Sequence, residues 1–311
     1  MKKLLFFALI VPWMLAMAGC QTDVRTDVSK SFPEGQLTIQ ATLEQPFMDT
    51  KTVRDGDGNV FWTPDDAISL FYGAGTAGGS KFTSTLTSNN ATSSFEGNIS
   101  AVTGVGDVTV DELMFWGLYP YDATSSCDGQ SVTMTLRSQQ VGMADTFAPN
   151  MAPTLGRAPG LLLSFKNIYS GLYLTVSEAG FQSFTFRANG NEPIAGRARV
   201  GWVEGAPQVL EFVSGETINE VTLTAPTSAG FEPGKKYYIL FYPQTMASGF
   251  TVEIKSASKV GTFVNSRSIT AVRNKINWIN NIDLNSNTTW TNVPNTENIQ
   301  GGSNPDIPWG N

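Results

Sequence analysis

The two cysteines are the most reactive side chains in this chain of 311 residues, and one of them stands in an unusual place. Cys20 directly follows an alanine and a glycine, and the run Leu4–Ala18 upstream carries no charge. Two lysines precede this run. A charged start, an apolar middle and small residues at the end are the anatomy of a secretory signal. The run of about 15 residues is shorter than the roughly 20 that span a bilayer, so a transmembrane anchor is the weaker interpretation.

The stretch Met17-Ala18-Gly19-Cys20 resembles the bacterial lipobox, with Met where Leu is commoner. In such signals the cysteine thiol is alkylated by a diacylglycerol, and the chain is then cut before the cysteine. The resemblance implies a signal peptide over residues 1–19, a lipidated linker over 20–35, and attachment to the outer membrane through the lipid on Cys20. Each buried CH₂ of the acyl chains contributes about 0.8 kcal/mol. The alternative is a plain signal peptide whose cleavage site abuts a cysteine.

The composition excludes several classes of function. The chain has no histidine, which removes Ser-His-Asp and Cys-His catalysis, His-ligated zinc and the usual neutral-pH base. Loss of Lys2 and Lys3 with the signal takes the formal charge from −7 to −9, so the chain has no electrostatic reason to bind nucleic acid. With Cys20 lipidated, Cys127 has no intrachain partner; it is an inert thiol or, alternatively, forms a link between subunits. We therefore expect no enzyme, no cofactor and no metal.

Short β-strands account for nearly all of the periodicity in the chain. Residues 37–43 alternate, with Leu37, Ile39, Ala41 and Leu43 on one face. Denser apolar runs at 113–119 and 161–165 predict fully buried strands. Further runs, separated by turn residues, lie at 68–72, 81–86, 131–136, 172–176, 184–187, 209–213, 220–223, 237–242 and 250–255. So many short strands predict an all-β fold built from β-sandwiches.

These runs divide near residue 168 into two series of roughly 120 to 135 residues each, a comfortable size for a domain. We predict an N-terminal β-sandwich domain over residues 36–168 and a C-terminal one over residues 169–290. Residues 291–311 hold scattered apolar side chains among Asn, Thr, Gly and Pro. We expect a flexible polar tail there.

Four aromatic-rich segments follow the lipobox in a fixed order: Phe61–Phe71, Phe115–Tyr121, Phe165–Val176, and Tyr237–Pro243 with Gly249–Ile254. They resemble the Trp-x-x-x-Asp-x-Ile strand entry, the Tyr-Pro strand end, the entry to the second domain and the late hairpin of fimbrillin-like lipoproteins of the Bacteroidales, which build type V pili. The resemblance implies two tandem transthyretin-like β-sandwich domains and a place in a surface fimbrium. It also implies assembly with other fimbrial subunits by β-strand addition.

In that family an arginine-specific protease removes the first strand at the cell surface. The first strand is predicted here over Gln36–Glu44, and a polar, glycine-rich segment follows at residues 50–59. Arg54 matches the family's cleavage position, with Lys51 second. Cleavage would remove the lipid together with the inward side chains of the strand, Leu37, Ile39, Ala41 and Leu43. The alternative is that Arg54 is an exposed loop residue and the strand stays, as in anchor-type members that keep their lipid.

The tail bears on the place of such a subunit in a filament. A stalk subunit should offer a regular apolar donor strand, and residues 285–311 alternate poorly. This favours a tip, accessory or anchor position, with an adhesive role toward a host or bacterial surface receptor.

Other candidate chemistry has simpler structural interpretations. Asp55–Asn59 places Asp, Asp and Asn at positions 1, 3 and 5 of a calcium loop, but Val60 stands where such a loop needs glycine, so a turn is favoured. Asp65 and Asp66 are adjacent and would point to opposite faces of a strand, which excludes an acid pair for glycoside hydrolysis. A turn-capping role after Pro64 is the better interpretation.

The alternative function is that of an outer-membrane surface glycan-binding lipoprotein, because aromatic platforms stack on sugars. Four of the seven tryptophans, at positions 62, 116, 202 and 278, lie in strand-like patterns that favour the core. Trp290 and Trp309 lie in polar surroundings.

Overall fold

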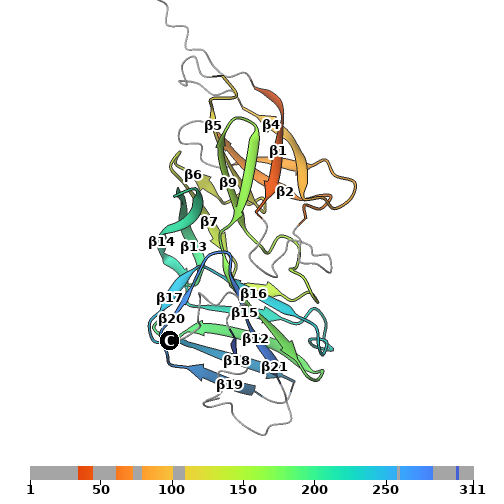
Figure 1. The fold of residues 1–311 in the computed structure, drawn as a ribbon, viewed down its shortest axis with the longest axis vertical. Helices are drawn as coiled ribbons and strands as arrows, with labels where there is room; N and C mark the ends of the chain where they lie inside the picture. The colour runs from red at the N-terminus through yellow and green to blue at the C-terminus, as the bar shows by residue number, and fades with distance from the viewer. Residues whose placement is uncertain are drawn as a thin grey trace, which may run out of the picture.

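The computed structural model describes residues 34–44, 61–72, 79–100, 109–257, 260–282 and 299–300. Within these ranges the regular secondary structure consists of β-strands alone, which confirms the predicted all-β class. The same ranges contain no helix long and apolar enough to cross a membrane. Figure 1 shows an elongated molecule, with the first strands at one end and the last strands at the other.

Seven strands at the N-terminal end form a closed barrel, in which each strand is hydrogen-bonded to two neighbours. Around the barrel the order is β1 (Gly35–Leu43), β10 (Leu162–Asn167), β9 (Thr154–Pro159), β5 (Met114–Tyr119), β2 (Ala67–Tyr72), β3 (Ser80–Ser84) and β4 (Thr92–Ile99). All neighbouring pairs are antiparallel except β1 and β10, which are parallel. The sheet of the N-terminal half therefore curls until β1 closes it.

The barrel interior is filled by aromatic and aliphatic side chains. Trp62, just before β2, is fully buried there, and its ring packs edge-on against Phe95, Tyr119 and Phe165 with centroid distances of 4.9, 5.3 and 5.3 Å. Edge-to-face pairs at such separations add stability beyond the area they bury. The tryptophan of the Trp-x-x-x-Asp-x-Ile segment is thus a core residue that several strands share.

A four-stranded sheet covers the outer face of the barrel at β2, β5 and β9. Its order is β14 (Ala206–Ile218), β13 (Ala195–Val203), β7 (Ser131–Leu136) and β6 (Ser126–Cys127). Phe71, Trp116 and Leu118 of the barrel pack against Val132 and Val200 of this sheet. Because β2 and β5 are covered on both faces, they are buried along nearly their whole length.

Strand β10 differs from the strand predicted at residues 161–165. The dense run predicts burial on both faces, but β10 alternates, with Leu163 and Phe165 inside and Leu162 66% exposed. That expectation is wrong because the four-stranded sheet covers β2, β5 and β9 and leaves the outer face of β10 at Leu162 and Ser164 in solvent.

The C-terminal end holds two sheets that enclose one large core. One sheet has the order β19 (Val260–Asn265), β18 (Phe250–Ser256), β12 (Phe181–Ala188), β15 (Glu220–Thr224) and β8 (Gln139–Val141). The other has the order β16 (Tyr237–Phe241), β11 (Ser170–Val176), β21 (Ile276–Ile282) and β22 (Ile299–Gln300). A ribbon of β17 (Gln244–Met246) and β20 (Ile269–Ala271) adds Met246, Ile269 and Ala271 to the core.

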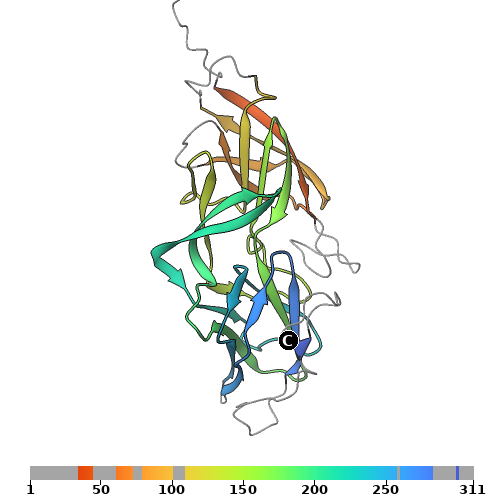
Figure 2. The same ribbon diagram turned by 60° about the vertical axis from the view of Figure 1, so that its left-hand side comes forward.

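Strands from the two sides of residue 168 mix in two of the sheets. β8, from the N-terminal side, pairs in parallel with β15. β13, from the C-terminal side, pairs with β7, and Figure 2 shows its long hairpin with β14 lying across the middle of the molecule. The domain boundaries at 36–168 and 169–290 stay a prediction, and these strands cross them.

Gln140 of β8 fixes the edge of the second C-terminal sheet. Its buried side-chain amide donates to the carbonyl oxygen of Leu240 at 2.7 Å, and its amide oxygen accepts from the Leu240 N–H at 2.9 Å. The side chain thereby pairs with edge strand β16 as a neighbouring strand would.

Replacement of this side chain by leucine should destabilise the fold. Gln140→Leu keeps the size but leaves two buried backbone groups of Leu240 without partners, at a cost of about 1–3 kcal/mol for each unsatisfied group. The exposed neighbour Gln139 gives the matched control Gln139→Leu, which should change the free energy of unfolding by less than about 0.5 kcal/mol. Urea unfolding measures both, and equal midpoints would contradict the assigned role.

Candidate functional site

β1 is the strand that closes the barrel, because it lies between β4 and β10 and pairs with both. Its pairing with β4 runs from Gly35↔Ile99 to Thr42↔Thr92, and its pairing with β10 runs from Gln40↔Leu162 to Leu43↔Phe165. Without β1, the backbone groups of two strand edges would lose their partners together. Such unpaired edges are templates for pairing with another chain. The place of β1 is therefore the candidate site for strand addition.

The side chains of β1 alternate as the sequence predicts. Ile39, Ala41 and Leu43 are 0%, 1% and 8% exposed and belong to the barrel core, and Leu37 is partly buried against the same core. Thr38 and Gln40 between them are exposed. The four apolar residues of the predicted first strand thus point into the barrel, and their removal stays a prediction.

The end of β1 is held by a partly buried ion pair. The guanidinium of Arg273, in the turn between β20 and β21, donates to both carboxylate oxygens of Glu44 at 2.6 and 3.0 Å. The backbone N–H of Asn167 donates to the same carboxylate at 3.0 Å, and its carbonyl oxygen accepts from Arg273 at 2.8 Å. Nothing in the sequence links Glu44 to Arg273, which lies 229 positions later.

Several sequence predictions fall outside the described residues. These are the signal peptide, Cys20, Lys51 and Arg54, the glycine-rich turn at 55–59, and Trp290 and Trp309 in the tail.

The carboxylates after Pro64 have separate structural roles. Asp66 is buried, and its two oxygens accept from the N–H of Thr63 at 2.7 Å and from the hydroxyl of Tyr119 at 3.0 Å. Asp65 is exposed in the turn with a positive φ of 68°, a conformation that Asp adopts more readily than most residues. Asp66 therefore caps the turn and anchors Tyr119, and the two carboxylates do not form a catalytic pair.

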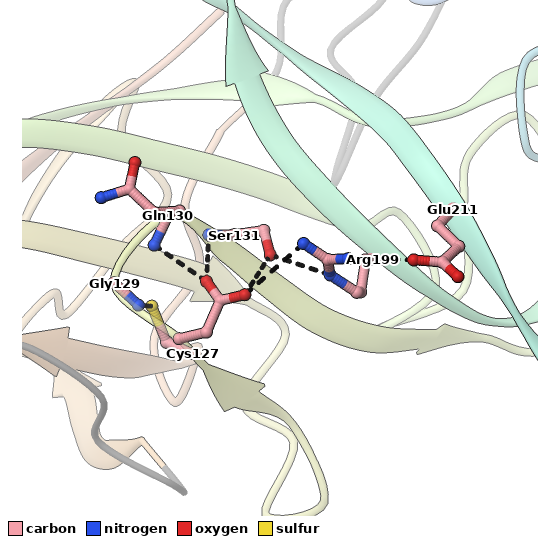
Figure 3. Close-up of polar contacts among 7 residues, drawn as sticks. Cys127, Gly129, Gln130, Ser131, Arg199 and Glu211 are labelled. Atoms are coloured by element: carbon pink, nitrogen blue, oxygen red, sulfur yellow. Dashed lines mark hydrogen bonds and ion pairs between the residues drawn. The ribbon is translucent and has the colours of Figure 1, made fainter.

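Cys127 is buried at the end of β6, where its sulfur accepts the N–H of Gly129 at 3.4 Å (Figure 3). Burial raises the pKa of the thiol above its ordinary value. The adjacent Asp128 carboxylate accepts from the N–H of Ser131 at 2.6 Å and lies 3.6 Å from Arg199, so the turn that covers the sulfur is held in place. A protonated, buried thiol is poorly reactive, which favours the inert interpretation of this cysteine.

The three tryptophans whose side chains the structure describes, Trp62, Trp116 and Trp202, do not form an exposed platform. Trp62 lies in the barrel, Trp116 lies under the four-stranded sheet, and Trp202 packs partly buried against the cluster between that sheet and the barrel. Within the same described ranges, no three Asp, Glu and Cys side chains gather closely enough to hold a metal ion.

The solved structures that the chain resembles include fimbrial and cell adhesion proteins of the Bacteroidales, the group that the sequence resemblance predicts. A "putative cell adhesion protein" of Bacteroides uniformis is 16% identical, with a TM-score of 0.45 over 80% of this chain and 93% of that one. The tip fimbrial protein Mfa3 of Porphyromonas gingivalis is 10% identical, with a TM-score of 0.37 over 80% and 94%. A fimbrial assembly protein of Parabacteroides distasonis is 11% identical, with a TM-score of 0.38 over 80% and 92%.

No protein-family model matches the chain, and neither does any curated protein sequence. Because the three structural matches fall below a TM-score of 0.5, a function for this chain has to be argued from its own strands.

Truncation of the β1 core face should cost more than truncation of its solvent face. Ile39→Ala removes a fully buried side chain from the barrel, and such changes destabilise by about 2–5 kcal/mol. Thr38→Ala, at the exposed neighbouring position, should stay within about 0.5 kcal/mol of the wild type. Equal free energies of unfolding for the two variants would show that β1 does not contribute to the barrel core.

Asp66 should give the fold a distinctive pH dependence. Burial raises its pKa from the ordinary 3.8, and this outweighs the hydrogen bonds from Thr63 and Tyr119, which lower it. The folded chain then holds this proton to higher pH than the unfolded chain, so the contribution of Asp66 to stability falls as pH rises from about 3.8 through the raised pKa.

Asp66→Asn removes this titration and keeps polar partners for Thr63 and Tyr119. The difference in unfolding free energy between this variant and the wild type should therefore shift in favour of the variant as pH rises through this range. Asp65→Asn is the matched control and should keep nearly the wild-type profile, because Asp65 is exposed, Asn tolerates its positive φ, and its charge is the smallest of the causes that shift the Asp66 pKa. Free energies of unfolding measured at a series of pH values from 3.5 to about 7 test this, and parallel profiles for the two variants would contradict it.

Proposed function

We propose that the chain is a non-enzymatic subunit of a cell-surface fimbrium of the type V pilus class, lipidated at Cys20 and carried to the outer membrane. Its assembly proceeds by proteolytic loss of the first strand after Arg54, with Lys51 as the second position, and by addition of a strand from another fimbrial subunit. The observation that carries the proposal is the position of β1, which alone completes the barrel between β4 and β10.

The physical basis is the apolar burial and backbone hydrogen bonding that the barrel lacks when the position of β1 is empty. Each large apolar side chain buried in the barrel contributes about 1.5–3 kcal/mol, and β1 supplies Ile39 and Leu43 fully and Leu37 in part. The backbone edges of β4 and β10 would also need new partners. A donor strand with apolar residues at alternate positions satisfies both demands, whereas a small ligand satisfies neither.

The proposed place of the cleaved subunit is the tip or an accessory position rather than the stalk, and the anchor position belongs to the alternative in which the first strand and its lipid stay. Residues 285–311 lack the regular alternation of a donor strand, so this segment is poorly suited to fill the barrel of a neighbour. A subunit that accepts a strand without donating one would end a filament, which is where an adhesive contact with a surface receptor belongs.

Cleavage and assembly can be tested together on the purified, lipidated chain. Treatment with an arginine-specific protease, in the presence of other fimbrial subunits that supply a donor strand, should give a lipid-free form whose intact mass is that of a chain beginning at Asp55. Mild denaturing electrophoresis should then show higher species that contain both subunits. The double variant Arg54→Ala with Lys51→Ala should stay lipidated and monomeric under the same treatment.

A cleaved form that never forms ladders, alone or with other fimbrial subunits, would overturn strand addition. An intact lipidated monomer that binds glycans, with binding lost on exchange of Trp290 or Trp309 for Ala, would favour the glycan-binding alternative instead.

A further inference from the structure

We propose that Arg273 selects the strand that completes the barrel by binding a carboxylate at the position of Glu44, directly after the last inward apolar residue. This inference rests on the proposed function and adds to it the chemistry of the partner. The strand it fits has four apolar residues at alternate positions, followed at once by Glu or Asp, and it comes from another fimbrial subunit.

The geometry around Glu44 is that of a specific carboxylate site. Arg273 makes two parallel hydrogen bonds to the two carboxylate oxygens, the arrangement in which Arg recognises carboxylates with the greatest directional specificity. A third donor, the N–H of Asn167, points at the same carboxylate. With side-chain exposures of 19% for Glu44 and 23% for Arg273, the pair is largely withdrawn from water.

The site is held in place by its surroundings. The Asn167 carbonyl oxygen accepts from Arg273, and the Asn167 side chain donates to the side-chain oxygen of Asn274 at 2.6 Å. Asn274 in turn donates its N–H to the carbonyl oxygen of Tyr169 at 2.8 Å, and both asparagines are buried. The guanidinium is therefore fixed at the end of the β1 place by groups that do not belong to β1.

Loss of β1 would remove Glu44 and keep every other member of this site. Arg273 would remain as a partly buried cation with its carbonyl partner and without its carboxylate, a state that costs free energy until another anion arrives. An incoming strand thus makes two separate contacts. The barrel interior binds its inward apolar face, and Arg273 binds its outward residue at the position of Glu44. Residues 285–311 contain no such pattern, so they are not the segment that this site selects.

Peptide exchange on the full chain tests the proposal. A specific protease site is inserted between residues 45 and 60 and the chain is cut there. The two fragments then stay associated through non-covalent contacts. Labelled, C-terminally amidated peptides of residues 34–44 then compete for the place of β1. The Glu44→Gln peptide should bind about 10-fold or more weakly than the native peptide, because it loses a charge-assisted, bidentate contact.

The same acid-to-amide change at the other end of the strand provides the matched control. Glu34 is exposed and precedes the first β1–β4 pair, so the Glu34→Gln peptide should bind like the native one. In protein carrying Arg273→Met, the native and Glu44→Gln peptides should bind alike. Equal binding of all peptides to the native protein would overturn this inference while leaving strand addition intact. Exchange of no peptide at all would overturn the proposed function and this inference with it.

Discussion

The closure of the barrel by β1 is the constraint on which the rest of the N-terminal half depends. A sheet that closes on itself has no free edges, and here the last closing ladder is the parallel one between β1 and β10. The six other strands are joined by antiparallel ladders, and Trp62 and its ring neighbours fill the space between them. The apolar interior between β4 and β10 is therefore closed to water only as long as β1 is in place.

The two sides of the barrel differ in how they are covered. On the side of β2, β5 and β9, the sheet of β14, β13, β7 and β6 buries the outer face as well, so these strands cannot leave without exposing two cores. On the side of β1 and β10, residues such as Gln40, Leu162 and Ser164 face solvent. β1 is buried on one face only, so its replacement leaves the core between the barrel and the four-stranded sheet undisturbed.

The sequence predicts the strands much better than their partners. Alternation over 37–43 and the dense run at 113–119 correspond to β1 and β5, because side-chain periodicity follows directly from which faces are buried. The run at 161–165 misleads, since Leu162 is apolar yet exposed. No local sequence pattern indicates that β8 pairs with β15, that β13 pairs with β7, or that Glu44 contacts Arg273. Such contacts join positions far apart in the chain, and a single sequence records only what each segment buries.

Cleavage of the segment that follows β1 would not by itself empty the barrel. In the intact chain the strand and its place are joined covalently, so the local concentration of β1 is on the order of millimolar. A cut removes that advantage but leaves the apolar contacts, the two ladders and the Glu44–Arg273 pair. The released strand must then diffuse away or be displaced by a strand that binds better. Exchange therefore favours a donor that matches β1 both at its inward apolar positions and at its terminal carboxylate, because a donor that lacks the carboxylate competes against a strand that has it.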